Sequence, residues 1–155
     1  AQLDRFLLKL SVGYPAPSDE SQILLNLQRE HPITAIGQVV DGTRLLDLQR
    51  LVWEVHVDDT VRDYIVRLGG ATRDHVDLAL GASPRGSLAL FKTAQALASL
   101  RGRDYVLPDD VKALAVPTLV HRLIVRPESA LRGYTAARIL DDLLGSTPLD
   151  IGDLD

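Results

Sequence analysis

Apolar residues recur at helical spacing along most of the chain, and this pattern predicts a mainly helical protein. The clearest stretch begins at Asp58, a residue type that favours a helix N-cap, and is expected to end at the Gly69-Gly70 pair. Its apolar positions fall at i, i+3, i+4 and i+7, which predicts a helix with one buried face. Those positions are Val61, Tyr64, Ile65 and Leu68.

Other helices are predicted to begin where a capping residue or a proline precedes an apolar stretch. The first is expected to run to about residue 30 with Ile23, Leu24 and Leu27 pointing inward. The second is expected to bear Leu45, Leu48 and Val52 on its apolar face. The predicted start positions are Ser18, Thr43, Ser83, Pro108 and Thr135.

Short extended stretches predict a minor pair of strands. Residues 121–125 are expected to pair with residues 105–106 or with residues 55–57 in a small ribbon. Residues 33–42 show no clear periodicity and are expected to form an ordered loop. Pro117 is expected to kink or break the helix in which it lies. The predicted fold class is therefore mainly α, a helical bundle of about five helices with a minor short-strand pair.

Residues 81–101 combine a loop with a helix start in a way that suits an anion. Ser83 is expected to be the N-cap, its hydroxyl accepting a first-turn amide, and Pro84 suits the first helical position. Arg85 places a cation at the positive end of the helix dipole, which is mildly unfavourable without an anion. A phosphate oxygen would turn this repulsion into attraction. The alternative is an arginine bonded to Asp77 or to water.

Composition narrows the classes of function. The chain has 155 residues, 46% of them hydrophobic, which is enough for one core. Its net charge of −4 argues against a general nucleic-acid binder. The absence of cysteine excludes a disulfide framework and a thiol nucleophile and suits a cytoplasmic protein. The four histidines are scattered, so no metal site is expected.

Nothing in the sequence predicts a membrane association. No apolar run approaches the roughly 20 residues that a membrane helix needs, and no signal peptide is evident. The first residue is not Met, so the chain is expected to be a piece of a longer protein. The paired carboxylates at residues 58–59, 109–110 and 141–142 are expected to be helix caps and surface charge.

Four separate motifs stand out along the chain: GASPRGS at residues 81–87, LRGRDYV at 100–106, PDDVK at 108–112 and HRLI at 121–124. Together they resemble the C-terminal part of the MoxR family of AAA+ ATPases. Upstream, AQLDRF at residues 1–6 is similar to the segment at the end of the family's ATPase core. The motifs occur in the family's order and span nearly the whole chain. Leu107 stands where family members commonly carry a capping Thr, which is expected to weaken that helix start by about 1 kcal/mol.

The resemblance implies a division of the chain and a role for two arginines. Residues 1–14 would be a remnant of the AAA+ core, with the arginine-finger segment and the last core strand. Residues 15–155 would be the helical C-terminal lid domain, with a loose acidic tail from residue 149. Arg85 would be the sensor arginine, with Ser83 and Pro84 beside it in the ATP site. Arg5 would be the arginine finger that acts in trans on the neighbouring subunit.

The residues alone leave other interpretations of these cations open. From the residues alone, Arg5 is more typical of a loop arginine paired with Asp4 than of an arginine finger. Arg73 is a candidate second cation near the nucleotide, but its position is more typical of a solvated loop.

The resemblance also implies cofactors and partners for the full-length protein. These are ATP with Mg²⁺, the chain's own AAA+ core, neighbouring subunits of a hexameric ring and proteins with a von Willebrand factor A domain. The implied activity is chaperone-like maturation or assembly of other proteins. This chain contains no G-x-x-x-x-G-K-[ST] loop, so alone it is expected to bind no cofactor and to hydrolyse no ATP.

Two alternatives belong to other classes of function. The first is a stand-alone helical module that binds a partner protein without nucleotide chemistry. The second is a helical DNA-binding domain that contacts phosphates through Arg101, Arg103, His121 and Arg122. The acidic net charge counts against the second, and neither a nucleic-acid partner nor a membrane is expected.

Overall fold

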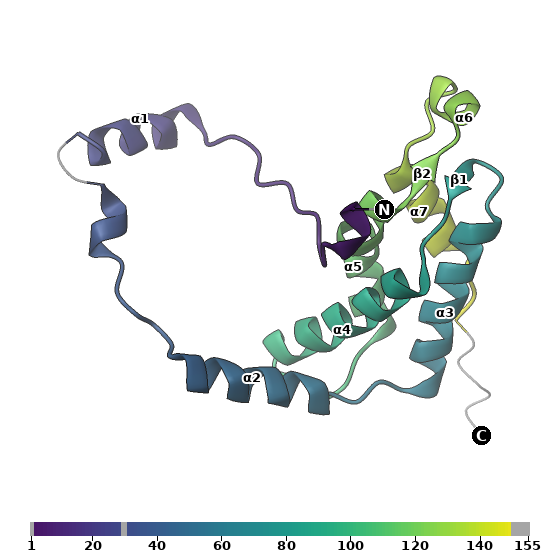
Figure 1. The fold of residues 1–155 in the computed structure, drawn as a ribbon, viewed down its shortest axis with the longest axis horizontal. Helices are drawn as coiled ribbons and strands as arrows, with labels where there is room; N and C mark the ends of the chain where they lie inside the picture. The colour runs from purple at the N-terminus through teal and green to yellow at the C-terminus, as the bar shows by residue number, and fades with distance from the viewer. Residues whose placement is uncertain (1, 29–30, 150–155) are drawn as a thin grey trace. The chain divides into compact units, whose positions relative to one another are not determined.

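The computed structural model describes residues 2–28 and 31–149 and confirms a mainly helical fold (Figure 1). Within these residues the chain forms seven α-helices, three 3₁₀ helices and two short strands. The α-helices are α1 (Pro17–Asn26), α2 (Gly42–Glu54), α3 (Asp59–Asp74), α4 (Pro84–Leu100), α5 (Pro108–Leu119), α6 (Pro127–Leu131) and α7 (Ala136–Ser146). The other elements are η1 (Leu3–Arg5), η2 (Pro32–Ala35), η3 (Val120–Arg122), β1 (Leu78–Leu80) and β2 (Ile124–Val125). Apart from Leu149, the predicted acidic tail lies outside the described residues.

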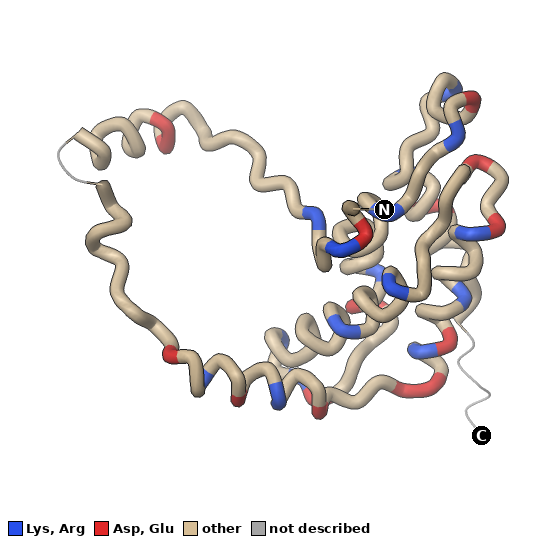
Figure 2. The backbone as a smooth tube through the Cα atoms, viewed as in Figure 1, with Lys and Arg blue, Asp and Glu red and all other residues tan. Residues whose placement is uncertain are grey.

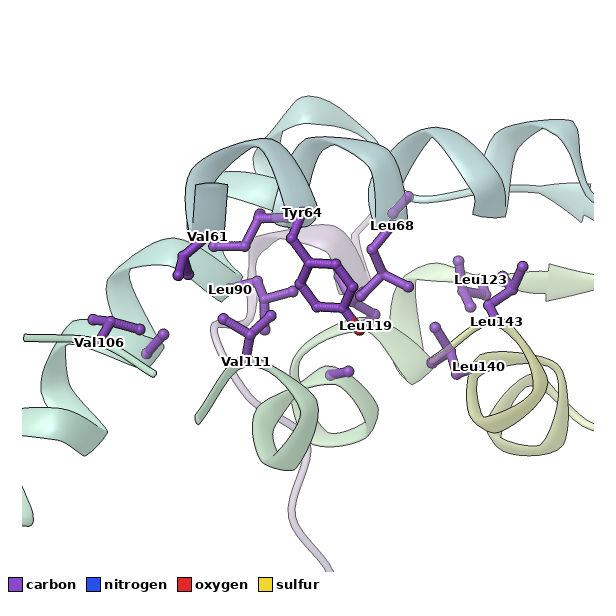
Figure 3. Packing of buried hydrophobic residues seen from close by; sticks show 14 of the residues in the cluster. Val61, Tyr64, Leu68, Leu90, Val106, Val111, Leu119, Leu123, Leu140 and Leu143 are labelled. Carbon is purple, nitrogen blue, oxygen red and sulfur yellow. The ribbon is translucent and has the colours of Figure 1, made fainter. Parts of the chain in front are cut away.

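Residue contacts divide the chain into two compact units. The larger unit consists of Ala1–Lys9 with Gln49–Asp155, and the smaller unit is Leu10–Leu48. The hydrophobic core belongs to the larger unit, where α3, α4, α5 and α7 pack together. Figure 3 shows the ring of Tyr64 pointing from α3 into this core, beside Leu90, Val111 and Leu119. All four of these side chains are almost completely buried.

Helix α3 begins as the sequence predicts but continues past its predicted end. The Asp58 carboxylate accepts a hydrogen bond from the Thr60 amide at 2.8 Å, so Asp58 is the N-cap. The Gly69-Gly70 pair does not terminate the helix, which runs to Asp74. Gly69 instead makes room for α4, because a Cβ at this position would lie 2.6 Å from the Ser87 hydroxyl oxygen.

The strand pair exists, but its predicted pairing is wrong. β2 pairs antiparallel with β1, and Leu78 lies opposite Val125. Residues 121–122 belong to η3 rather than to a strand, and residues 55–57 and 105–106 meet only at a single parallel bridge, His56 with Tyr105. The sequence signal for β1 is the alternation of larger apolar residues with other residues from Val76 to Leu80.

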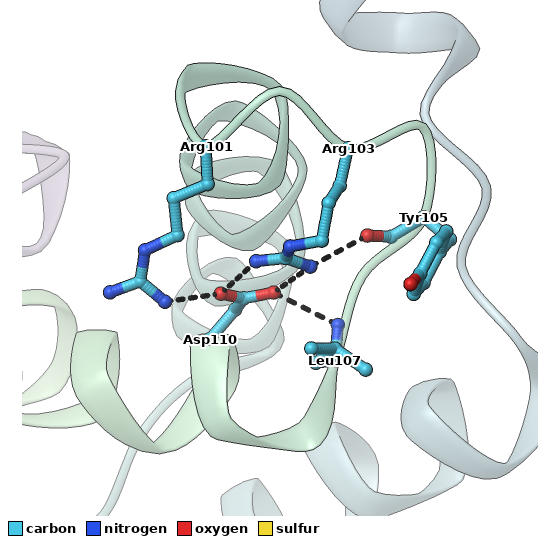
Figure 4. Close-up of polar contacts among 5 residues, drawn as sticks. All are labelled: Arg101, Arg103, Tyr105, Leu107 and Asp110. Carbon is cyan, nitrogen blue, oxygen red and sulfur yellow. Dashed lines mark hydrogen bonds and ion pairs between the residues drawn. The ribbon is translucent and has the colours of Figure 1, made fainter.

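Helix α5 is capped at its start by a carboxylate from its own first turn. Leu107 cannot cap with its side chain, but the Asp110 carboxylate accepts its amide at 2.9 Å. Asp110 is therefore a helix cap, as the sequence predicts, but its carboxylate is completely buried and is not a surface charge. Figure 4 shows Arg101 and Arg103 converging on the same carboxylate, at 2.8 Å and 2.7 Å. The helix then continues through Pro117 to Leu119 before it changes to the 3₁₀ helix η3.

A second buried carboxylate positions α6, which the sequence did not predict. Asp77 accepts hydrogen bonds from the Ser129 hydroxyl at 2.6 Å and from Arg132 at 2.9 Å. Its backbone carbonyl also accepts the Arg126 amide at 2.9 Å. Helix α6 is therefore fixed to the segment that leads into β1. Helix α7 follows, capped as predicted by the Thr135 hydroxyl.

The smaller unit contains α1, η2 and the first part of α2, and every described residue from 10 to 48 is exposed. Helix α1 starts at Pro17 rather than Ser18 and ends at Asn26. Asp41 rather than Thr43 accepts the first-turn amide of α2, that of Arg44, at 2.7 Å. The apolar residues predicted to point inward are exposed, because no described part of the chain covers them. They include Ile23, Leu24, Leu27, Leu45 and Leu48.

Candidate functional site

The candidate site lies at the start of α4, where the structure confirms two of the predicted positions. Ser83 is the N-cap residue and Pro84 is the first helical residue. The Ser83 hydroxyl does not accept a first-turn amide, however, and instead donates to the Asp4 carboxylate at 3.2 Å. The Ser83 carbonyl accepts the Gly86 amide at 2.8 Å. The serine therefore links the helix start to the N-terminal segment.

The loop before α4 is held against the end of α3. The Ala82 amide donates to the Thr72 hydroxyl at 2.9 Å, and that hydroxyl donates to the Gly69 carbonyl at 2.7 Å. Thr72 and Ala82 are both completely buried. Only glycine fits at position 81, because a Cβ there would lie 2.5 Å from the backbone of α3. These contacts fix the position of the Ser83-Pro84-Arg85 turn.

Arg85 is exposed at this turn and makes no hydrogen bond or ion pair with any residue that the structure describes. The alternative partner, Asp77, is occupied by Ser129 and Arg132. An arginine in the first turn is repelled by the helix dipole. The charge on Arg122 adds to this repulsion. An anion bound at this place would relieve both effects.

Arg122 is a second cation near the start of α4. The sequence indicated a role for it only as a phosphate contact in the DNA-binding alternative. Its guanidinium donates to the Phe6 carbonyl at 2.7 Å and to the Asp4 carbonyl at 3.4 Å, and it lies 3.7 Å from the Asp4 carboxylate. The side chain is 2% exposed. Burial lowers the pKa of Arg122, the Asp4 carboxylate opposes this, and the charge on Arg85 lowers the pKa further. Neither periodicity nor spacing could have marked this arginine as buried.

The N-terminal segment packs against the end of α5 and against η3 (Figure 1). Arg5, the predicted arginine finger, is exposed in η1. The alternative pairing of Arg5 with Asp4 is wrong, since Asp4 interacts with Ser83 and Arg122. Residues 6–10 form no strand, and the Lys9 amide donates to the Pro117 carbonyl at 2.8 Å.

A hollow of about 310 Å³ lies between η1, the loop before α4 and the start of β2. Its lining includes the polar side chains of Asp4, Ser83, His121 and Arg122. The His121 ring contacts the Phe6 carbonyl at 2.9 Å. The hollow therefore lies at the junction between the segment that carries Arg5 and the helix that carries Arg85.

The cationic side chains proposed to contact DNA instead contact other groups of the protein. Arg101 and Arg103 hold Asp110, and His121 and Arg122 contact the carbonyl of Phe6. Figure 2 shows acidic and basic residues interleaved along the backbone of the larger unit. The structure thus gives no support to a phosphate-binding role for these four residues.

The remaining candidates give no further site. Arg73 lies in the last turn of α3 and its Nε donates to the Gly69 carbonyl at 3.2 Å. Among residues 2–28 and 31–149, no three His, Cys, Asp or Glu side chains gather in a way that could hold a metal ion. In the same part of the chain, no helix has the length and apolar character needed to cross a membrane.

Comparison with known proteins identifies a domain family and relatives of this chain. Residues 70–143 match the AAA lid domain family. The uncharacterized protein YeaC of Bacillus subtilis is 42% identical over 151 residues, 97% of this chain and 47% of YeaC. Chaperone MoxR1 of Mycobacterium tuberculosis is 40% identical over 134 residues, 81% of this chain and 35% of MoxR1.

A solved structure gives the same fold. The crystal structure of a candidate ATPase from Cytophaga hutchinsonii superimposes with a TM-score of 0.87 and 26% identity, and the match covers 96% of this chain and 48% of that one. The chain spans about half the length or less of the curated relatives it matches. The chain therefore belongs to the MoxR family of AAA+ ATPases, of which it forms the C-terminal portion with the lid domain.

Proposed function

We propose that this lid places Arg85 as a sensor arginine against the phosphates of ATP bound by the core of the full-length protein. The observation that carries the proposal is an exposed guanidinium in the first turn of α4 with no ion-pair partner among the described residues. Pro84 fixes the backbone at this turn, and Thr72 fixes the loop before it. A triphosphate is an anion that suits such a helix start.

Arg5 has a different role in the proposal. ATP with Mg²⁺ supplies the transferable γ-phosphoryl group, and the exposed guanidinium of Arg5 stabilises the negative charge on that group from the neighbouring subunit. Arg85 acts on the nucleotide of its own subunit. The two arginines of one chain therefore serve two different nucleotides.

The wider function is proposed from family membership. Rotation of the lid about the Tyr14-Pro15-Ala16-Pro17 segment would couple the nucleotide state to the shape of a hexameric ring. The ring would work in the cytoplasm on the maturation or assembly of other proteins, together with proteins that carry a von Willebrand factor A domain. The relative named Chaperone MoxR1 supports the chaperone-like part of this proposal.

The test is the substitution Arg85→Ala in the full-length protein. We expect ATP turnover to fall by about 100-fold, because a preorganised cation is lost from the developing charge. The melting temperature should stay unchanged, because Arg85 is exposed and contacts no described residue. Turnover is measured by phosphate release at saturating ATP.

The matched control is Arg62→Ala. Arg62 is an exposed arginine near the start of α3 that pairs only with the surface residue Asp59 in the described chain, at 2.8 Å. This variant should keep the turnover of the parent protein. Equal turnover in Arg85→Ala and the parent protein would show that Arg85 is not a sensor residue.

A further inference from the structure

The segment that carries Arg5 and the helix that carries Arg85 are joined through one buried arginine. Arg122 donates to the backbone carbonyls of Asp4 and Phe6, the two residues that flank Arg5. We propose that Arg122 is a positioning residue that holds Arg5 in place for catalysis in trans, an inference that rests on the proposed function of Arg5.

A rigid joint between the N-terminal segment and the start of α4 is formed by Asp4, Phe6, Ser83 and Arg122. The side chain of Arg122 is 2% exposed, and burying a guanidinium costs free energy unless its donors are satisfied. Its two terminal nitrogens find their acceptors on Asp4 and Phe6, whereas its Nε has no hydrogen-bond partner among the described residues. The low exposure and the backbone acceptors together fix the path of the chain on both sides of Arg5, while Arg5 itself stays exposed.

The other side of the joint is the start of α4. A Cβ at Gly86 would lie 3.3 Å from Cδ of Arg122, so the glycine lets the arginine lie against the helix. Asp4 completes the joint, since its carboxylate accepts the Ser83 hydroxyl at 3.2 Å and lies 3.7 Å from Arg122. Ser83, the N-cap of α4, is thus linked directly to Asp4, the residue before the proposed arginine finger.

This joint connects segments that are distant in sequence. Asp4 and Phe6 precede the proposed hinge at residues 14–17, and Ser83 and Arg122 follow it. A displacement of α4 caused by nucleotide at one site would therefore carry Arg5 with it toward or away from the next site in the ring. Arg122 would in this way couple neighbouring ATP sites without contacting either nucleotide.

The test is a double-mutant cycle in the full-length protein with Arg5→Ala, Arg122→Met and the double variant. Met keeps the apolar packing and removes every donor. We expect Arg5→Ala to lower kcat by at least about 100-fold. Arg122→Met should lower kcat by about tenfold with a change in the KM for ATP of less than about threefold. The double variant should turn over no more slowly than Arg5→Ala, because Arg122 acts only through Arg5.

Controls separate positioning from folding. Arg132→Met removes another arginine that bonds a carboxylate, that of Asp77, and should leave kcat unchanged. Arg122→Lys, which can still donate to the Phe6 carbonyl, should recover part of the lost rate. If Arg122→Met does not fold, Asp4→Asn takes its place in the cycle, since Asp4 is partly exposed and contacts both Arg122 and Ser83.

The outcomes distinguish this inference from the proposed function. Multiplicative losses in the double variant, or an unchanged kcat in Arg122→Met, would overturn the positioning role of Arg122. An unchanged kcat in Arg5→Ala would instead refute the arginine-finger role on which the inference rests.

Discussion

Asp110 caps a helix as the sequence predicts, but it does so from the interior of the protein. Its carboxylate is completely buried and accepts hydrogen bonds from Arg101, Arg103 and the Leu107 amide. Burial alone would raise its pKa, but the hydrogen bonds from Arg103 and Leu107 and the charges of both arginines outweigh burial and lower the pKa below the ordinary 3.8. The carboxylate therefore caps α5 and joins it to the segment after α4.

The substitution Asp110→Asn is expected to lower the free energy of unfolding at pH 7 by about 3 kcal/mol, because it removes the buried charge to which the half-exposed Arg101 and the partly buried Arg103 donate. In the parent chain, the stability contributed by Asp110 should be fully present above pH 3.8, the ordinary pKa of the unfolded state. This contribution should be lost as the pH falls through the lower pKa of folded Asp110. The variant should lack this component of the acid transition. Urea denaturation between pH 3 and pH 7 measures both effects.

The neighbouring residue provides the control for this prediction. Asp109 is 85% exposed and lies 3.8 Å from Lys112, so Asp109→Asn should change stability by less than about 0.5 kcal/mol. An equal loss in both variants would mean that helix-dipole charge, rather than the buried cluster, accounts for the effect.

At the scale of elements, the start of α4 depends on the end of α3. The Ala82 amide is buried and its acceptor is the Thr72 hydroxyl. Thr72→Val keeps the shape of the side chain but leaves this amide without a partner, which should cost about 2 kcal/mol of unfolding free energy. Thr72→Ser keeps the hydroxyl, loses one methyl group and should cost about 1 kcal/mol.

Chemical denaturation of the two variants distinguishes a hydrogen-bond effect from a packing effect. A larger loss in Thr72→Ser than in Thr72→Val would mean that the methyl group, and not the hydroxyl, holds the loop before Arg85. The expected order therefore tests whether the candidate site is built on the contact between Thr72 and Ala82.

Local signals predicted the elements whose causes are local. The caps at Asp58 and Thr135 and the proline at the start of α4 follow from side-chain chemistry within one turn. The resemblance to the MoxR family supplied the lid fold.

The features that the sequence did not predict depend on contacts between distant residues. The pairing of β1 with β2 joins residues more than 40 positions apart, and the role of Gly69 depends on Ser87 in another helix. The burial of Arg122 depends on contacts with Asp4 and Phe6, which lie 118 and 116 positions earlier in the chain. One-dimensional spacing contains no information about such contacts, so the joint between Arg5 and Arg85 was found only in the structure.

At the scale of the whole molecule, the two units differ in what their apolar residues contact. The larger unit buries Tyr64, Leu68 and Leu90 almost completely. In the smaller unit every described residue is exposed, including Ile23 and Leu24. Exposed apolar faces of this kind are stabilised when another surface covers them, and the relatives are about twice as long as this chain.

This difference predicts a contrast in amide hydrogen exchange. In the 155-residue chain, amides of α1 should exchange orders of magnitude faster than those of α3 and α4, because only the latter are held by a packed core. In the full-length protein, α1 should gain protection if the core domain covers it, whereas α3 and α4 should exchange as they do in the isolated chain. Hydrogen exchange followed by mass spectrometry on both proteins measures this. Equal protection of α1 and α4 in the isolated chain would show that α1 is stable without any covering surface, and the inferred dependence on the remainder of the protein would then be wrong.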